Sequence, residues 1–230
     1  MSYLDLKSTT AEHDPPAPSE DAKLYKIIKP KSGWQALFSY AGLLAWNLFA
    51  GTLTKVSGSL VGNANLVSKV YFPRLVLPLS TIFSSLLDFT VALLMLALLL
   101  LVYHVTPGAG ILLLPVWMAL IVLLATGIGL YASSLMVSYR DIGFILPVAT
   151  QFLLYASPVA YAVSAVPEKL RTVYLLNPIS SLLEAFRWSI LNRGALHPAM
   201  IGYAALVSVG VFLFGAFAFR RMERKFADVI

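Results

Sequence analysis

The chain has 230 residues, of which 59% are hydrophobic and only 12% are charged, and its mean hydropathy is +0.80. These values lie far outside the range of soluble domains, so the composition predicts a polytopic membrane protein. The absence of cysteine excludes disulfides and thiolate metal sites. The net charge of +6 is carried by loops and tails, as in cytoplasmic segments of membrane proteins, and no soluble basic face favours nucleic acid as a partner.

The amino-terminal region is polar, so we expect insertion to rely on internal spans. Residues 1–22 combine acids, three prolines and small polar residues, a composition that predicts a disordered tail. Residues 23–37 begin with four lysines between apolar residues. Two interpretations of this basic segment stay open: it lies on anionic lipid headgroups, or it is a solvated tail.

Residues 38–230 predict an all-α transmembrane domain of about five spans. The first, residues 38–54, is marginal, because 17 residues make a helix of about 25 Å against a hydrocarbon core of about 30 Å. A longer first span would have to include the charged residue Lys55. In the third span, Gly127 and Gly129 offer a smooth patch for close helix contact. The other four predicted spans cover residues 75–103, 111–137, 144–163 and 198–219.

Residues 144–163 contain helix breakers, at Pro147 and at Ser157-Pro158, and we expect both to interrupt the span. Residues 167–194 are too charged for a span and too apolar for a plain loop. They predict two short helical pieces hinged at Asn177-Pro178, forming an external hairpin that is either re-entrant or surface-lying. Within it, Glu184 and Arg187 have the spacing of a helical ion pair.

The number of predicted spans conflicts with the side of the membrane that the positive-inside rule assigns to each loop. The positive-inside rule puts residues 63–74, residues 138–143 and the carboxyl-terminal tail inside. If residues 38–62 also cross the membrane, the lysine-rich segment before them lies outside, against its charge. Either this segment fails to cross, or a preceding span is absent from the chain.

Several motifs together resemble a known family: GLLAWNLFAGTLT from Gly42, NANLVSKVYFPR from Asn63, SYRD from Ser138 and LNP from Leu176. They are similar to the membrane subunit of ABC-2-type exporters, in the branch that exports O-antigen, capsular polysaccharide or teichoic acid. In those permeases an interface helix, a first span and an external loop precede a segment like FSYAGLLAW. Here Phe38 follows Leu37 directly, with no span and loop between them, so the resemblance favours the absence of that first span.

The resemblance implies a transport subunit without enzymatic activity or cofactor. Two copies would form a homodimer in the bacterial cytoplasmic (inner) membrane, with the carboxyl terminus in the cytoplasm, and pass lipid-linked polysaccharide outward. No GxxxxGK[ST] motif occurs, so ATP hydrolysis is expected in a separate ATP-binding cassette subunit. That subunit would dock on a coupling helix, which the resemblance places at Asn63, Asn65, Val67, Lys69, Tyr71, Phe72 and Arg74. Without the resemblance, the same residues would suit an ordinary membrane-proximal loop.

Residues of the translocation path are harder to assign. Asp88 lies deep in its span, where an acid should face a partner or water, although a neighbouring helix could equally satisfy it. Aromatic rings offer a sugar chain contact area without fixed hydrogen bonds, but they also form interfacial belts. The aromatic candidates are Trp46, Tyr155, Tyr161, Tyr174 and Trp188.

Two further readings compete with transport. A membrane-bound transferase acting on lipid-linked sugars would need several carboxylates or histidines at one membrane face, whereas the 11 acids are scattered. His104 and His197 lie in separate turns without an acid cluster, so no metal site is expected. The other reading is a non-functional truncated permease, and the missing span favours it.

Overall fold

The computed structural model describes residues 34–69, 72–159, 174, 176–192, 196 and 198–223. Within these residues all regular structure is helical, which confirms the predicted all-α polytopic fold. The expected disordered tail and residues 23–33 of the basic segment lie outside the described residues, as do Tyr71 and Tyr161. Residues 34–37 of that segment begin the first described helix. The helices are α2 (Trp34–Gly62), α3 (Ala64–Lys69), α4 (Val76–Val102), the 3-10 turn η1 (Ala109–Leu113), α5 (Leu114–Ser138), α6 (Ile142–Ala156), α8 (Pro178–Leu191) and α9 (Pro198–Glu223).

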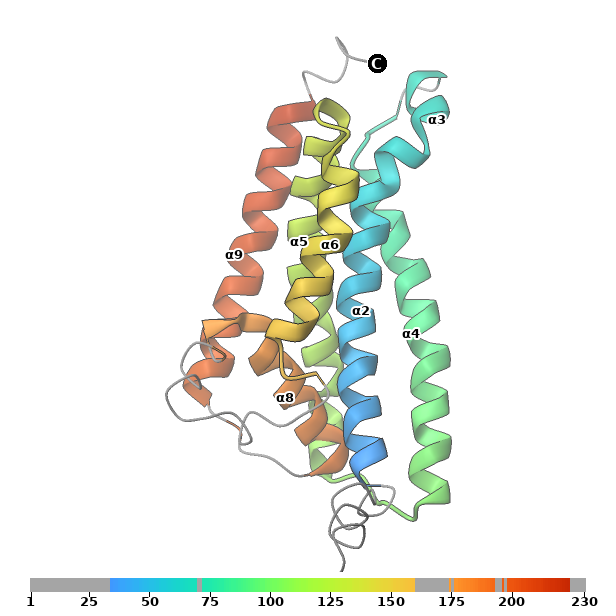
Figure 1. Cartoon of the computed structure of the whole chain (residues 1–230), viewed down its shortest axis with the longest axis vertical. Coiled ribbons are helices and arrows are strands. Elements are labelled where there is room, and N and C mark those ends of the chain that lie inside the picture. Colours follow the sequence, from blue (N-terminus) through green and yellow to red (C-terminus); the bar gives the residue numbers. More distant parts are fainter. Residues whose placement is uncertain are drawn as a thin grey trace, which may run out of the picture.

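Four of the described helices, α2, α4, α5 and α9, are long and apolar enough to cross a membrane. They form an elongated bundle in which α4 and α9 lie at opposite edges and α2 and α5 lie between them (Figure 1). Side chains of α2, α5 and α8 supply most of the buried apolar core. The fourth predicted span, residues 144–163, is represented by α6, which has 15 residues and is therefore only about 22 Å long.

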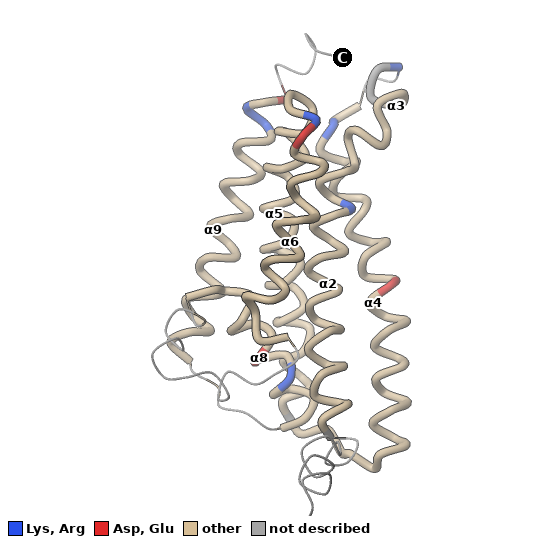
Figure 2. The backbone as a smooth tube through the Cα atoms, in the orientation of Figure 1, with Lys and Arg blue, Asp and Glu red and all other residues tan. Residues whose placement is uncertain are grey.

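Charged side chains gather at one end of the bundle, where α3 and the last turn of α9 lie (Figure 2). We call this the charged end. Helix α8 lies toward the opposite end (Figure 1). The two ends therefore differ in chemistry, as expected for a protein that crosses a membrane with a fixed orientation.

Helix α2 is much longer than the 17 residues predicted for the first span. It runs for 29 residues, about 43 Å, from the opposite end of the bundle to the charged end (Figure 1). The length of α2 therefore favours the alternative in which this segment crosses the membrane. The helix can include Lys55 because the ammonium of this residue forms an ion pair with a carboxylate on α4.

The predicted glycine patch on α5 is confirmed. A methyl group on Gly127 would lie 2.6 Å from the backbone of Phe212 on α9, and one on Gly129 would lie 2.8 Å from the side chain of Val56 on α2. From the other side, a methyl group on Gly215 of α9 would collide with the carbonyl oxygen of Gly127. Helices α5 and α9 therefore approach with backbone against backbone, which only small residues permit.

The two predicted helix breakers behave differently. Helix α6 continues through Pro147, so the expected interruption there is wrong. Proline at this position removes one hydrogen bond to the carbonyl of Gly143, near the start of the helix, and the remaining turns persist. At Ser157-Pro158 the helix does end, as predicted.

Helix α8, the second piece of the predicted hairpin, is packed into the bundle rather than lying on its surface. Residues 167–173, in the first piece, lie outside the described residues. Most of its residues are buried against α2, α5 and α9, and its Leu182, Leu183 and Phe186 are fully buried. It begins as predicted at Asn177-Pro178, where Asn177 caps the helix by accepting a hydrogen bond from the backbone of Ile179 at 3.3 Å. The buried position fits the re-entrant interpretation.

We predict that Gly215→Ala destabilises the bundle by about 1–3 kcal/mol, because the added methyl group has no space against α5. The matched control is Gly210→Ala on the same helix, where a methyl group would meet nothing within 4 Å. Thermal unfolding in detergent should show a lower midpoint for the first variant only. Equal midpoints would contradict the close contact.

Candidate functional site

The short helix α3 stands at the charged end, one residue after α2 ends. Asn63 forms the break: its side-chain amide donates to the carbonyl of Ser59 at 2.9 Å, and its own carbonyl accepts from Leu66 at 2.9 Å. Leu66 is 45% exposed, and Asn65 and Lys69 are exposed as well. The helix therefore presents an apolar side chain and a cation away from the bundle, the combination that a protein partner can bind.

The segment after α3 is tied to the end of α9. Phe72 and Pro73 lie between α3 and α4, as predicted. The backbone N–H of Arg74 donates to Oε1 of Glu223 at 3.2 Å, and its guanidinium donates to the Glu223 carbonyl at 3.5 Å. A force on α3 can thus reach both α4, through the chain, and α9, through these bonds.

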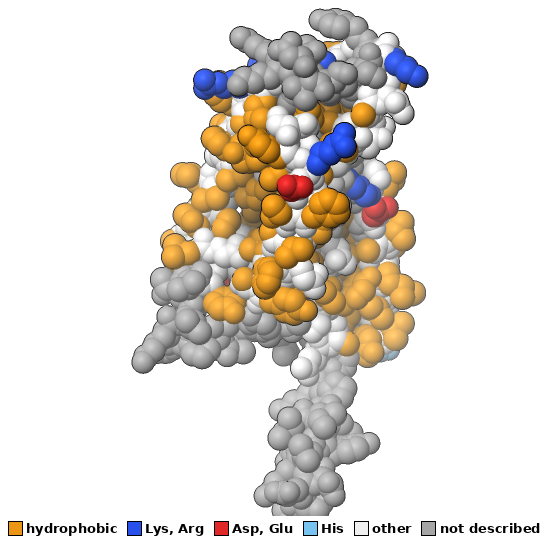
Figure 3. Space-filling model, turned by 45° about the horizontal axis from the view of Figure 1, so that its top comes forward, with side chains coloured by type: hydrophobic (Ala, Val, Ile, Leu, Met, Phe, Trp, Pro, Cys, Tyr) orange, Lys and Arg blue, Asp and Glu red, His pale blue; other side chains and the backbone are white. Residues whose placement is uncertain are grey.

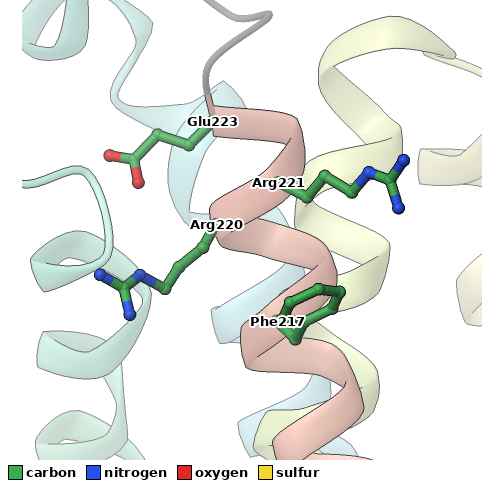
Figure 4. A pocket seen from close by; sticks show the side chains of 4 residues that line it. All are labelled: Phe217, Arg220, Arg221 and Glu223. Carbon is green, nitrogen blue, oxygen red and sulfur yellow. The ribbon is translucent and has the colours of Figure 1, made fainter.

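A cavity of 640 Å³ opens beside the last turns of α9. Its lining within the described residues is Phe217, Arg220, Arg221 and Glu223. Arg220 and Glu223 extend to one side of the helix and Arg221 to the other (Figure 4). This distribution spreads positive charge around the charged end rather than focusing it on one ligand position.

The deep acid Asp88 is paired with a cation. Lys55 on α2 donates to Oδ2 of Asp88 on α4 at 2.5 Å and to the hydroxyl of Ser84 at 2.9 Å. The neighbouring helix thus satisfies the carboxylate, which was one of the two expected outcomes. The pair is not buried, however, because the side chain of Asp88 is 72% exposed and that of Lys55 is 32% exposed.

Next to this pair, a groove of 210 Å³ runs between α2 and α4. Its walls are apolar apart from a few polar residues near the ion pair. The lining comprises Leu44, Asn47, Leu48, Gly51, Lys55, Ser85, Asp88, Phe89 and Ala92.

The aromatic candidates for the path are dispersed. Trp46 is only 4% exposed and packs with its ring centroid 5.5 Å from that of Phe49, so it belongs to the core. Trp188 is half-buried, with its ring against Gly110. Tyr174 is also half-buried, whereas Tyr155 at the end of α6 is 70% exposed. Of these four, only Tyr155 presents its ring freely at the surface of one copy.

Arg187 on α8 is the largest fully buried side chain. Its guanidinium donates to the carbonyl oxygens of Pro158 and, at 2.7 Å, Val159, and lies 4.3 Å from the ring centroid of Phe38. Burial lowers the pKa of Arg187 to about 10, and the nearby carboxylate of Glu184 opposes this shift, so the side chain stays charged at neutral pH. The predicted ion pair with Glu184 stays a prediction.

Helix α8 is fixed by further bonds from its neighbours. The indole N–H of Trp117 on α5 donates to Ser189 at 2.7 Å, and the side-chain amide of Asn177 donates to Ser157 at 3.0 Å. The rings of Phe89 and Phe186 meet edge to face with centroids 6.0 Å apart. Helix α8 is therefore held by α4, α5 and the end of α6 together.

The described residues contain no group of three or more His, Asp or Glu side chains placed to hold a metal ion. What they do contain is a bundle of membrane-crossing helices, an exposed short helix at the charged end and an intramembrane ion pair. These features are those of a polytopic helical membrane protein with an exposed element at one end.

Comparison with known proteins identifies the family. Residues 25–191, more than half of the chain, match the family described as ABC-2 type transporter. The chain belongs to this family.

Three relatives are similar to most of the chain. An O-antigen export system permease protein RfbA of Klebsiella pneumoniae is 27% identical over 198 residues, and a second protein of that name from the same organism is 27% identical over 195 residues. The protein of that name from Myxococcus xanthus is 25% identical over 195 residues. Each alignment covers 84% of this chain and 75% of the relative.

Two residues that organise the structure were missed in the sequence. Lys55 appeared only as an obstacle to extending the first span, because its partner Asp88 lies 33 residues away. Arg187 was assigned to a local ion pair, whereas its bonds reach back 28 and 29 residues to the end of α6. The one available signal was the presence of a charge within an otherwise apolar segment, which calls for a partner.

We predict that Arg187→Leu lowers the free energy of unfolding by about 1–3 kcal/mol, because two buried carbonyl oxygens lose a charged donor. Arg187→Lys should recover only part of this loss, since an ammonium lacks the planar fork of a guanidinium. The control is Arg140→Leu, an exposed arginine at the charged end. Thermal unfolding in detergent should separate the three variants in this order, and equal losses at both arginines would refute the assignment.

Proposed function

We propose that this chain is the membrane subunit of an exporter that moves lipid-linked polysaccharide across the bacterial cytoplasmic membrane, driven by a separate ATP-binding cassette subunit. Membership of the ABC-2 family and the names of the three relatives support this class of substrate. The observation that carries the proposal is the exposed helix α3, which stands at the charged end between two spanning helices.

The charged end faces the cytoplasm in this proposal. The connection from α5 to α6, which includes Arg140, and the last turn of α9, which includes Arg220 and Arg221, lie there (Figure 1). Cytoplasmic segments of membrane proteins are enriched in such residues. The carboxyl terminus is then cytoplasmic, and α8 lies toward the external face. Helix α3 becomes accessible to a soluble ATPase.

Helix α3 is the proposed docking element. Leu66 offers apolar area and Lys69 offers charge, and both are exposed. The bonds from Arg74 to Glu223 link the following segment to α9. Movement of the ATPase would therefore shift α3, α4 and the end of α9 together.

The channel itself forms between two copies in this proposal. Asp88 and Tyr155 lie exposed on the outside of one copy, where a path between copies would place its lining. We further propose that a span typical of the family is absent before α2. One observation supports this absence: α2 begins at the end of the bundle that this proposal places outside (Figure 1).

Lys69→Glu should reduce the amount of ATPase subunit that co-purifies with the tagged chain, because the substitution reverses the charge that α3 presents. The expected loss is about tenfold if one charge-assisted contact is replaced by repulsion. Quantitative immunoblotting or mass spectrometry of the purified complex measures it.

The matched control for this experiment is Arg140→Glu, which reverses an exposed charge at the same end without touching α3. Unchanged ATPase recovery with Lys69→Glu would exclude α3 as the docking element. Equal loss with both variants would indicate attraction by the whole charged end instead.

Orientation can be checked with single cysteines, because the chain has none of its own. A cysteine at Gln35, near the start of α2, should react with a membrane-impermeant maleimide added to intact cells. A cysteine at Lys69 should react only after the cells are opened. The reverse pattern would mean that the chain inserts with α3 outside.

A further inference from the structure

The outer face of α9 is an apolar stripe. Helix α9 lies at one edge of the bundle (Figure 1), and only 17% of its most apolar stretch is buried, the lowest share among the four spanning helices of the described chain. Leu206, Leu213 and Phe217 are 60–74% exposed and follow one another at intervals of seven and four residues. These intervals place them on one side of the helix. Lipid acyl chains can therefore pack along this side.

The stripe ends beneath a cation. Arg221 is exposed and lies four residues after Phe217, which is one turn, about 6 Å, nearer the charged end. Figure 4 shows the ring of Phe217 below Arg221, and both residues line the cavity of 640 Å³. In Figure 3, hydrophobic side chains cover the flank of the bundle, and Lys and Arg side chains are concentrated toward the charged end. The cavity therefore lies where the apolar surface gives way to charge.

The two sides of the cavity differ in charge. Arg220 extends to the same side as the carboxylate of Glu223, which accepts from the backbone N–H of Arg74 at 3.2 Å (Figure 4). Arg221 extends to the other side, and no described acidic residue lines the cavity there. Within the described part of the chain, neither a hydrogen bond nor an ion pair engages its guanidinium. An anionic group is therefore attracted more strongly to the side of Arg221.

The height of this cavity in the membrane indicates a lipid rather than a soluble anion. With 26 residues, α9 is about 39 Å long, which exceeds a hydrocarbon core of about 30 Å, so its last turns extend into the headgroup layer. Phe217 then borders the hydrocarbon, and Arg221 lies among the headgroups. A ligand that contacts both must carry an anion at one end and hydrocarbon at the other. Basic pockets at the ends of spans bind acidic headgroups in this way.

We propose that this cavity binds an anionic phospholipid, with Arg221 donating to the headgroup phosphate and Phe217 contacting the adjoining acyl chain. A guanidinium can donate two parallel hydrogen bonds to a phosphate. Phosphatidylglycerol is a lipid of this kind. In phosphatidylcholine the quaternary ammonium would lie near Arg221 and reduce the attraction, so net negative charge is favoured. Binding requires only that α9 crosses a membrane, so it does not depend on the proposed export function.

Tryptophan fluorescence tests the location. Phe217→Trp places an indole in the cavity, and the fluorescence of the unsubstituted chain accounts for its four native tryptophans. The full chain is reconstituted in vesicles of phosphatidylcholine that contain a rising fraction of brominated lipid, which quenches tryptophan on contact. Half-maximal quenching should need about fivefold less brominated phosphatidylglycerol than brominated phosphatidylcholine, because one basic residue near an anionic surface contributes about this factor.

The matched control is Leu206→Trp on the same stripe. Leu206 lies 15 residues before Arg221, about 22 Å away along the helix. One acyl chain spans only half of the hydrocarbon core, about 15 Å, so a lipid held at Arg221 does not reach this position. The two brominated lipids should quench the control equally. Equal quenching by the two lipids in the Phe217→Trp variant would overturn the proposal.

Arginine substitutions in the Phe217→Trp background test the headgroup contact. Arg221→Gln should remove the fivefold preference for phosphatidylglycerol. Arg220→Gln should leave most of it, because Glu223 already offsets the charge on that side. Both arginines are exposed, so neither substitution removes a buried contact. Equal losses would mean that the whole charged end attracts the lipid, and would overturn the role of Arg221.

A competing anion distinguishes the lipid from free phosphate, which shares its phosphate group. Inorganic phosphate is added at constant ionic strength, so that screening of the charges does not change. An unchanged preference for phosphatidylglycerol supports a lipid site. Loss of the preference would show that the cavity binds phosphate itself, and the lipid assignment would then be wrong.

Discussion

A buried arginine secures the part of this bundle that a helix cannot form alone. Beyond Ala156 the backbone leaves the helical path, and its carbonyl groups need donors that neither lipid nor apolar side chains supply. Arg187 provides them at Pro158 and Val159. It fits because Gly42 leaves room: a methyl group there would collide with both the Val159 carbonyl and the guanidinium. Arg187 therefore joins α8 to the segment after α6 and to α2, in addition to the other contacts that hold α8.

The two ends of the bundle use arginine in different ways. At the end near α8, Arg187 is withdrawn from solvent and fixes an irregular segment against the core. At the charged end, Arg74 joins the α3–α4 segment to the last residue of α9. Between them, α5 and α9 are locked by backbone contact at Gly127 and Gly215. If α3 is displaced, these contacts leave the neighbouring helices little freedom to stay in place.

The sequence predicted those features that depend on local pattern. Long apolar runs located the spanning helices α4, α5 and α9, glycine spacing located the close contact of α5, and Asn177-Pro178 marked the start of α8. It missed the length of α2 and the persistence of α6 through Pro147, and it left two alternatives open for α8. The length of α2 and the burial of α8 depend on tertiary contacts: Lys55 and Arg187 find partners about 30 residues away, and no periodicity encodes such pairings.

The Lys55–Asp88 pair also has a consequence for how the protein enters the membrane. When α2 emerges from the ribosome, Lys55 is an uncompensated charge in a helix whose polar and small residues already make it a weak inserter. Its counter-charge arrives 33 residues later, within the far more apolar α4. Stable insertion of α2 therefore waits for α4, and the two helices enter the bilayer as a hairpin rather than one after the other.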